Sequence, residues 1–141
     1  LGTIIRLSKA LKISTGFMFD ADSGYSYSIV RSQDRKRINR AVSGRREKPE
    51  YEYLSLSMGV TSRHMESFIV TLKGNEYGDE PSTHEGEEFL YVLEGSLTIK
   101  LGKKEEVLHE GDSIFYLSTV PHALKNNGDA NAVILAVVYT G

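Results

Sequence analysis

Two histidines and one glutamate stand out as residues whose types could do chemistry together: His84, Glu88 and His122. Two imidazole nitrogens and a carboxylate oxygen can hold one side of a six-coordinate non-haem Fe(II) ion and leave its other positions open. The chain has no cysteine, which excludes thiolate ligands and disulfide bonds. We therefore predict that these three side chains bind one divalent transition metal, either Fe, Mn, Ni or Zn.

The spacing of His84 and Glu88 sets a condition on the backbone between them. In a straight strand four residues span about 13 Å, whereas ligand atoms that share one ion lie within about 4 Å of each other. The chain must therefore bend. Gly86 stands at the midpoint, where its freedom to adopt positive φ would let His84 turn back toward Glu88.

A pocket without metal is the alternative, in which the same three side chains hydrogen-bond to one another and to a small acid. Metal binding is favoured because two imidazoles and a carboxylate are costly to bury without a shared counter-charge. Two further histidines are predicted to lie on the surface: His64 has no partner at ligand spacing, and His109 directly precedes the turn at Glu110-Gly111.

The elements that must position these residues are short strands between turns. An apolar run at residues 89–93 follows Glu88, and a second run at 114–116 leads toward His122. Further β-rich stretches are predicted at residues 51–57, 66–73, 97–101 and 132–139. The last of these is the most apolar run of the chain, and we predict a central strand there. This pattern is typical of an all-β barrel or sandwich.

Length and composition suit one globular domain outside the nucleic-acid-binding class. The 141 residues carry a formal net charge of −2, which argues against DNA binding by bulk charge. Residues 31–48 are locally basic but contain no aromatic residue for base stacking, so we interpret them as a solvated strand and loop. Neither a signal peptide nor an apolar span of membrane length is evident. The protein is predicted to be cytoplasmic, with no membrane partner.

Residues 84–126 resemble the two sequence motifs of the cupin superfamily. The first motif is matched by His84, Glu88 and Gly95, with Ser82 at the position of that motif's first histidine. The resemblance thus implies a metal site that lacks one of its usual ligands. It also implies an all-β fold, the double-stranded β-helix (jelly-roll-like) barrel, which we expect over residues 51–141 with a short helix at the N-terminus.

The second cupin motif is also present. It is matched by Gly111, His122 and Asn126. The chain departs from the usual pattern at Leu117 and Thr119, where the family usually has proline and glycine. Several fixed spacings agree at once, which makes the resemblance specific.

Residues 3–13 form the one clear helical pattern, with Ile4, Leu7 and Leu11 on one face. One interpretation is a helix packed against the barrel. The other is that residues 1–14 resemble the last helix of a helix-turn-helix DNA-binding domain of the phage-repressor type. On that interpretation residues 1–16 are the remnant of such a domain, residues 17–50 are a linker with the strands that lead into the barrel, and an N-terminal part precedes Leu1.

The combined resemblance is to the C-terminal cupin sensor domains of helix-turn-helix/cupin transcriptional regulators. It implies a homodimer that binds a small-molecule effector, sometimes with a metal, and contacts DNA only through the missing N-terminal domain. We favour this sensor function because the architecture is common.

An enzyme is the alternative function. Residues 84–95, followed by Pro121-His122, are also similar to the mononuclear iron epoxidases that act on hydroxypropylphosphonate, which share the helix-turn-helix plus cupin layout and a His, Glu, His triad. This resemblance implies an oxygenase or epoxidase-like reaction. Beyond the triad, the sequence identifies no catalytic residue.

Overall fold

Nine strands form the framework of the residues that the structure describes. A computed structural model describes residues 26–38, 51–74, 80–126 and 128–141. The strands are β1 (Lys36–Arg37), β2 (Tyr51–Ser55), β3 (Met65–Leu72), β4 (Glu87–Glu94), β5 (Ser96–Leu101), β6 (Lys104–His109), β7 (Ser113–Leu117), β8 (His122–Lys125) and β9 (Ala132–Tyr139). Within the described residues the only helical segment is a single 3₁₀ turn at Ser32–Asp34.

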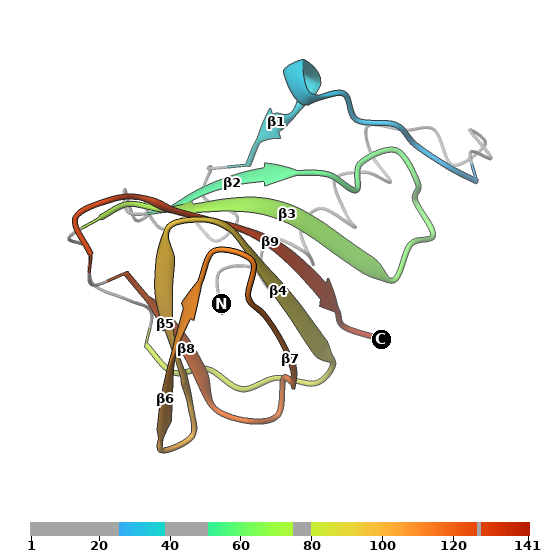
Figure 1. Ribbon diagram of the computed structural model, residues 1–141. Helices are drawn as coiled ribbons and strands as arrows, with labels where there is room; N and C mark the ends of the chain where they lie inside the picture. The colour runs from blue at the N-terminus through green and yellow to red at the C-terminus, as the bar shows by residue number, and fades with distance from the viewer. Residues whose placement is uncertain (1–25, 39–50, 75–79, 127) are drawn as a thin grey trace.

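The strands form two antiparallel sheets that curl around a common interior (Figure 1). The larger sheet has the order β1-β2-β3-β9-β4-β7, and the smaller sheet has the order β6-β5-β8. The chain passes from one sheet to the other between β4 and β5 through Gly95, whose φ is +75°. Strand β9 lies between β3 and β4, which confirms the prediction of a central strand at 132–139.

The core follows from strict alternation along the long strands. In β3 and β9 every second side chain is buried. The inward residues include Phe68, Val70, Ile134 and Ala136, each with no exposed surface. Burying one large apolar side chain contributes about 1.5–3 kcal/mol. The predicted all-β barrel is therefore confirmed.

The polarity of the barrel interior changes along its length. Across the larger sheet, Glu66 on β3 and Glu88 on β4 both stand opposite Val138 on β9, and Tyr116 on β7 stands opposite Glu88. Side chains in such a cross-strand row point to the same face. Both carboxylates are only 1% exposed. One end of the barrel interior is consequently polar, whereas the inward residues that follow on β3, β9 and β4 are apolar.

The predicted N-terminal helix and the helix-turn-helix remnant at residues 1–16 lie outside the described residues, as does part of the segment 17–50. Strand β1 falls within that segment and pairs with β2. Among the described residues, no helix is long and apolar enough to cross a membrane.

Candidate metal centre

The three candidate ligands reach the polar end of the barrel from different elements. His84 lies in the loop before β4, Glu88 is the second residue of β4, and His122 begins β8 on the opposite sheet. The site therefore forms only where the two sheets face each other.

The backbone bends at Gly86 as the spacing predicted. Its φ is +111°, in the left-handed region that favours glycine. A Cβ at this position would lie 1.9 Å from the carbonyl oxygen of Tyr139, so no other residue fits without moving the end of β9. The bend is held by two backbone hydrogen bonds, from Ser118 N to Gly86 O (2.9 Å) and from His84 N to Ser118 O (3.0 Å).

The bend brings the three side chains together. Nε2 of His84 is 2.7 Å from Oε1 of Glu88, and Nε2 of His122 is 3.3 Å from the same oxygen. One ligand atom from each residue lies within 4.8 Å of the others. The side chains of Glu88 and His122 are fully buried and that of His84 is 14% exposed. Among the described residues, only these three form such a cluster.

Both histidines are oriented by backbone carbonyls. Nδ1 of His122 is 2.7 Å from Val120 O, and Nδ1 of His84 is 2.9 Å from Glu85 O. Because a carbonyl oxygen only accepts, each Nδ1 carries a hydrogen, and whenever the ring is neutral its lone pair lies on Nε2. Each Nε2 therefore faces Oε1 of Glu88 either with a proton, which it can donate, or with a lone pair, which can ligate a metal.

Glu88 is held as a carboxylate by its surroundings. Tyr116 Oη donates a hydrogen bond to Oε2, and Ser118 Oγ lies 3.4 Å from Oε1. Burial is the largest single influence and raises the pKa of Glu88, but His122, Tyr116 and His84 together more than offset it and hold the pKa below its ordinary value. Glu88 therefore stays ionised at neutral pH.

This donor set fits a metal ion. Two buried imidazole lone pairs beside a buried carboxylate repel one another unless a cation lies between them. Histidine ligands commonly donate their second ring N–H to a carbonyl or carboxylate, which fixes the ring. His84 and His122 are already arranged in that way. A hydrogen-bonded pocket without metal would instead require a proton on Nε2 of His84 or His122, which would then donate to Oε1 of Glu88.

A second buried charge pair lies at the same end of the barrel. Arg63 Nε is 2.9 Å from Glu66 Oε1, with side chains 8% and 1% exposed. Arg63 also donates to Val60 O at 2.6 Å. Glu66 stands two strands away from Glu88 in the same inward row. The positive charge that balances Glu66 is therefore supplied by Arg63, a residue of the same chain.

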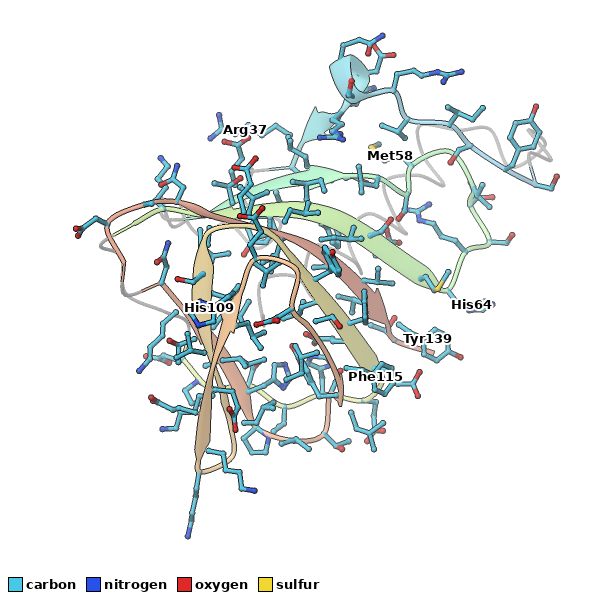
Figure 2. All side chains as sticks on the ribbon, viewed as in Figure 1. Arg37, Met58, His64, His109, Phe115 and Tyr139 are labelled. Atoms are coloured by element: carbon cyan, nitrogen blue, oxygen red, sulfur yellow. The ribbon has the colours of Figure 1, made fainter. Side chains whose placement is uncertain are left out.

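The other two histidines are exposed, as predicted (Figure 2). His64 precedes β3 and contacts the ring of Tyr139, with ring centroids 6.5 Å apart. His109 ends β6 on the smaller sheet.

Ser82, at the position of the motif's first histidine, pairs with His122 through an isolated antiparallel bridge. Asn126 has a structural role, donating to Leu72 O and Ala130 O at 3.0 and 2.9 Å.

Sequence reasoning missed four polar residues of the barrel interior: Tyr116, Ser118, Arg63 and Glu66. A signal for two of them existed. The segment that follows Gly111 alternates, with Ile114, Tyr116 and Ser118 on one face and Phe115 and Leu117 on the other. If Ile114 points inward, Tyr116 and Ser118 point inward as well. The Arg63–Glu66 pair gave no comparable signal, because charged residues at that end of a strand usually lie in solvent.

The fold and site together define a small β-barrel protein with a candidate mononuclear metal centre. Residues 68–138 match the Cupin_2 cupin domain family. The chain belongs to the cupin family.

Solved structures resemble the chain to different degrees. Hydroxypropylphosphonic acid epoxidase from S. wedmorenis is 28% identical, with a TM-score of 0.66 over 85% of this chain and 62% of that one. A structure of Fe(II) HppE is 29% identical, with a TM-score of 0.66 over 85% and 63%. An HTH_3 family transcriptional regulator from Vibrio cholerae is 22% identical, with a TM-score of 0.56 over 65% and 52%, and shows the fold alone. The chain thus spans less than two thirds of the length of these proteins.

Proposed function

We propose that His84, Glu88 and His122 bind one divalent transition metal, with Fe(II) the first candidate, and that the open side of the metal takes a small molecule. One observation carries the proposal: two buried Nε2 atoms, each with its Nδ1 hydrogen bonded to a carbonyl, stand beside the carboxylate Oε1 of Glu88. Mn, Ni and Zn are the other candidates.

When bound, such a metal supplies Lewis acidity and, in the case of Fe(II), oxygen activation. The chain's own residues orient the ligands that would hold the metal. Val120 O and Glu85 O hold the two imidazole rings in the neutral tautomer that ligates through Nε2. Tyr116 donates to Glu88 and fixes one carboxylate oxygen.

We infer that a metal-dependent oxidation, of the oxygenase or epoxidase-like kind, is the activity this site supports best. Support comes from the three-ligand set, which leaves one side of an octahedral ion free, and from the 28–29% identity to the epoxidase and Fe(II) HppE over 85% of this chain. The substrate class and the reaction are parts of the proposal.

The second candidate is the sensor function predicted from the sequence. Residues 1–14 resemble the last helix of a phage-repressor-type DNA-binding domain. In this proposal the barrel of a cytoplasmic homodimer binds a small-molecule effector, and DNA is contacted only through a domain N-terminal to the barrel. The metal would then serve to bind the effector.

Substitution of single histidines tests the metal site. After loading with Fe(II), Mn(II), Ni(II) or Zn(II) and removal of free metal, elemental analysis should find about one ion per wild-type chain. His122→Ala should weaken metal binding by more than about a hundredfold, because the loss of even an outer-shell partner typically lowers metal affinity by about 10- to 100-fold. His109→Ala and His64→Ala remove exposed histidines and should retain the ion. Equal metal content in all three variants would refute the triad.

A second experiment separates the two functions. The Fe(II)-loaded protein is supplied with oxygen, hydroxypropylphosphonate and a two-electron reductant, since epoxide formation provides only two of the four electrons that reduce O2 to water, and oxygen consumption is recorded beside the His122→Ala variant. Metal-dependent consumption by the wild type alone supports the enzyme. Absence of turnover, together with a metal-dependent change in operator binding by the full-length protein, supports the sensor.

A further inference from the structure

The hydroxyl of Ser82 is enclosed, and no described residue provides it with a hydrogen-bond partner. Its Oγ is buried and makes no hydrogen bond to any described residue. An unsatisfied buried hydroxyl costs about 1–3 kcal/mol of desolvation, so such groups are uncommon where they serve packing alone. The neighbouring Thr83 is exposed and carries no such penalty.

The backbone places the Ser82 side chain beside the proposed metal site. Ser82 N donates to His122 O at 3.0 Å, and His122 N donates to Ser82 O at 3.1 Å. Residues that exchange both hydrogen bonds in an antiparallel bridge present their side chains to the same face, with Cβ atoms about 4.5–5.5 Å apart. The hydroxyl of Ser82 therefore lies next to the imidazole of His122.

The net charge of the metal site determines which kind of ligand can bind beside the Ser82 hydroxyl. A divalent ion held by the single carboxylate of Glu88 carries one net positive charge. The nearby Arg63–Glu66 pair is neutral as a unit. A small monoanion is therefore favoured on the open side of the ion, and a hard oxygen donor suits most of the candidate metals.

We propose that Ser82 is a positioning residue that donates a hydrogen bond from Oγ to the oxygen of a small monoanionic ligand bound on the open side of the metal. This inference rests on the proposed metal centre. Ser82 itself does not ligate the ion, and its hydroxyl gains its missing partner only when an oxygen-donor ligand arrives. The residue would thus select oxygen donors over nitrogen donors such as imidazole.

The test uses the whole chain loaded with Co(II), whose visible absorption reports coordination, and acetohydroxamate as the monoanionic probe. Wild type, Ser82→Ala, Ser82→Thr and the matched control Thr83→Ala should bind Co(II) within about twofold of one another. Ser82→Ala should bind acetohydroxamate on the order of tenfold more weakly, the value of one hydrogen bond to a charged group. Ser82→Thr should restore the affinity, and Thr83→Ala should not change it. Imidazole should bind all four proteins equally.

Thermal unfolding of the metal-free proteins separates positioning from a structural role. Because Ser82→Ala removes an unsatisfied hydroxyl, its Tm should equal or exceed that of the wild type. A lowered Tm would show that the hydroxyl stabilises the fold, and it would overturn the proposal.

The remaining outcomes fail in distinguishable ways. Unchanged acetohydroxamate affinity in Ser82→Ala, with Co(II) bound normally, overturns the role of Ser82 and leaves the metal centre intact. A large loss of Co(II) affinity in Ser82→Ala identifies the hydroxyl as a direct ligand and overturns the positioning role. Failure of the wild type to bind Co(II) refutes the metal centre and this inference with it.

Discussion

Two buried carboxylates in one row of the barrel show how differently the same group can be neutralised. Glu66 and Glu88 are both 1% exposed, and both stand opposite Val138. Glu66 is paired with the guanidinium of Arg63 at 2.9 Å. Glu88 faces two imidazoles whose Nδ1 hydrogens are already bonded to carbonyls.

The difference lies in the source of the positive charge. Arginine is protonated at every physiological pH, so Glu66 has a permanent counter-charge that is encoded in the chain. The histidines beside Glu88 present Nε2 atoms that can exchange a proton for a metal ion, which suits an exchangeable cation. We therefore interpret Glu66 as a structural group and Glu88 as a binding group, and this contrast can be tested.

The largest expected effect concerns Arg63. Replacement by methionine, Arg63→Met, leaves Glu66 buried without that counter-charge and should lower the free energy of unfolding by about 3–5 kcal/mol. Urea denaturation of the metal-free protein measures it. The matched control is Lys125→Met, which breaks an exposed pair with Glu105 and should cost about 1 kcal/mol or less. Similar losses in both variants would show that burial does not distinguish the two pairs.

A smaller effect is expected when Glu88 loses its charge. In wild-type protein, free Zn(II) at one hundred times its Kd should raise the free energy of unfolding by about 2.7 kcal/mol. Glu88→Gln keeps the shape of the side chain but removes an anionic ligand, so most of this stabilisation should disappear. Glu87→Gln changes the exposed neighbour on β4 and should keep it. Equal stabilisation of both variants would show that the metal binds elsewhere.

The smallest effect is expected at Tyr116. Tyr116→Phe removes the hydroxyl that donates to Glu88, and metal affinity should fall by about tenfold, at the lower end for outer-shell partners. Isothermal titration with Zn(II) measures the change. Tyr91→Phe removes an exposed hydroxyl from the outer side of β4 and serves as the control. An unchanged affinity in Tyr116→Phe would show that Glu88 is oriented by other contacts.

Two members of the proposed triad, His84 and Glu88, could be paired from the sequence because their spacing and the turn at Gly86 are local. His122 comes much later in the chain, and the resemblance to the second cupin motif supported its choice. The structure brings the three side chains together as expected, and their binding of a metal stays a prediction. The bend at Gly86 is confirmed by its φ of +111°.

The partners of the site could not be derived in the same way because they depend on strand register. Tyr116 meets Glu88 across 28 residues of sequence. Glu66 joins the same row only because β9 separates β3 from β4. A shift of one residue in either pairing would turn these side chains to the outer face. Pattern alone does not specify which strands become neighbours.

The position of β9 also determines when during synthesis the barrel can be completed. Met65–Leu72 and Glu87–Glu94 are made early, yet the strand that joins them, Ala132–Tyr139, is made near the end of the chain described here. Such long-range pairing is slow and leaves edges exposed until it is complete. We expect the nascent chain to remain protease-sensitive on the ribosome until β9 has left the exit tunnel, and only then to close around its polar interior.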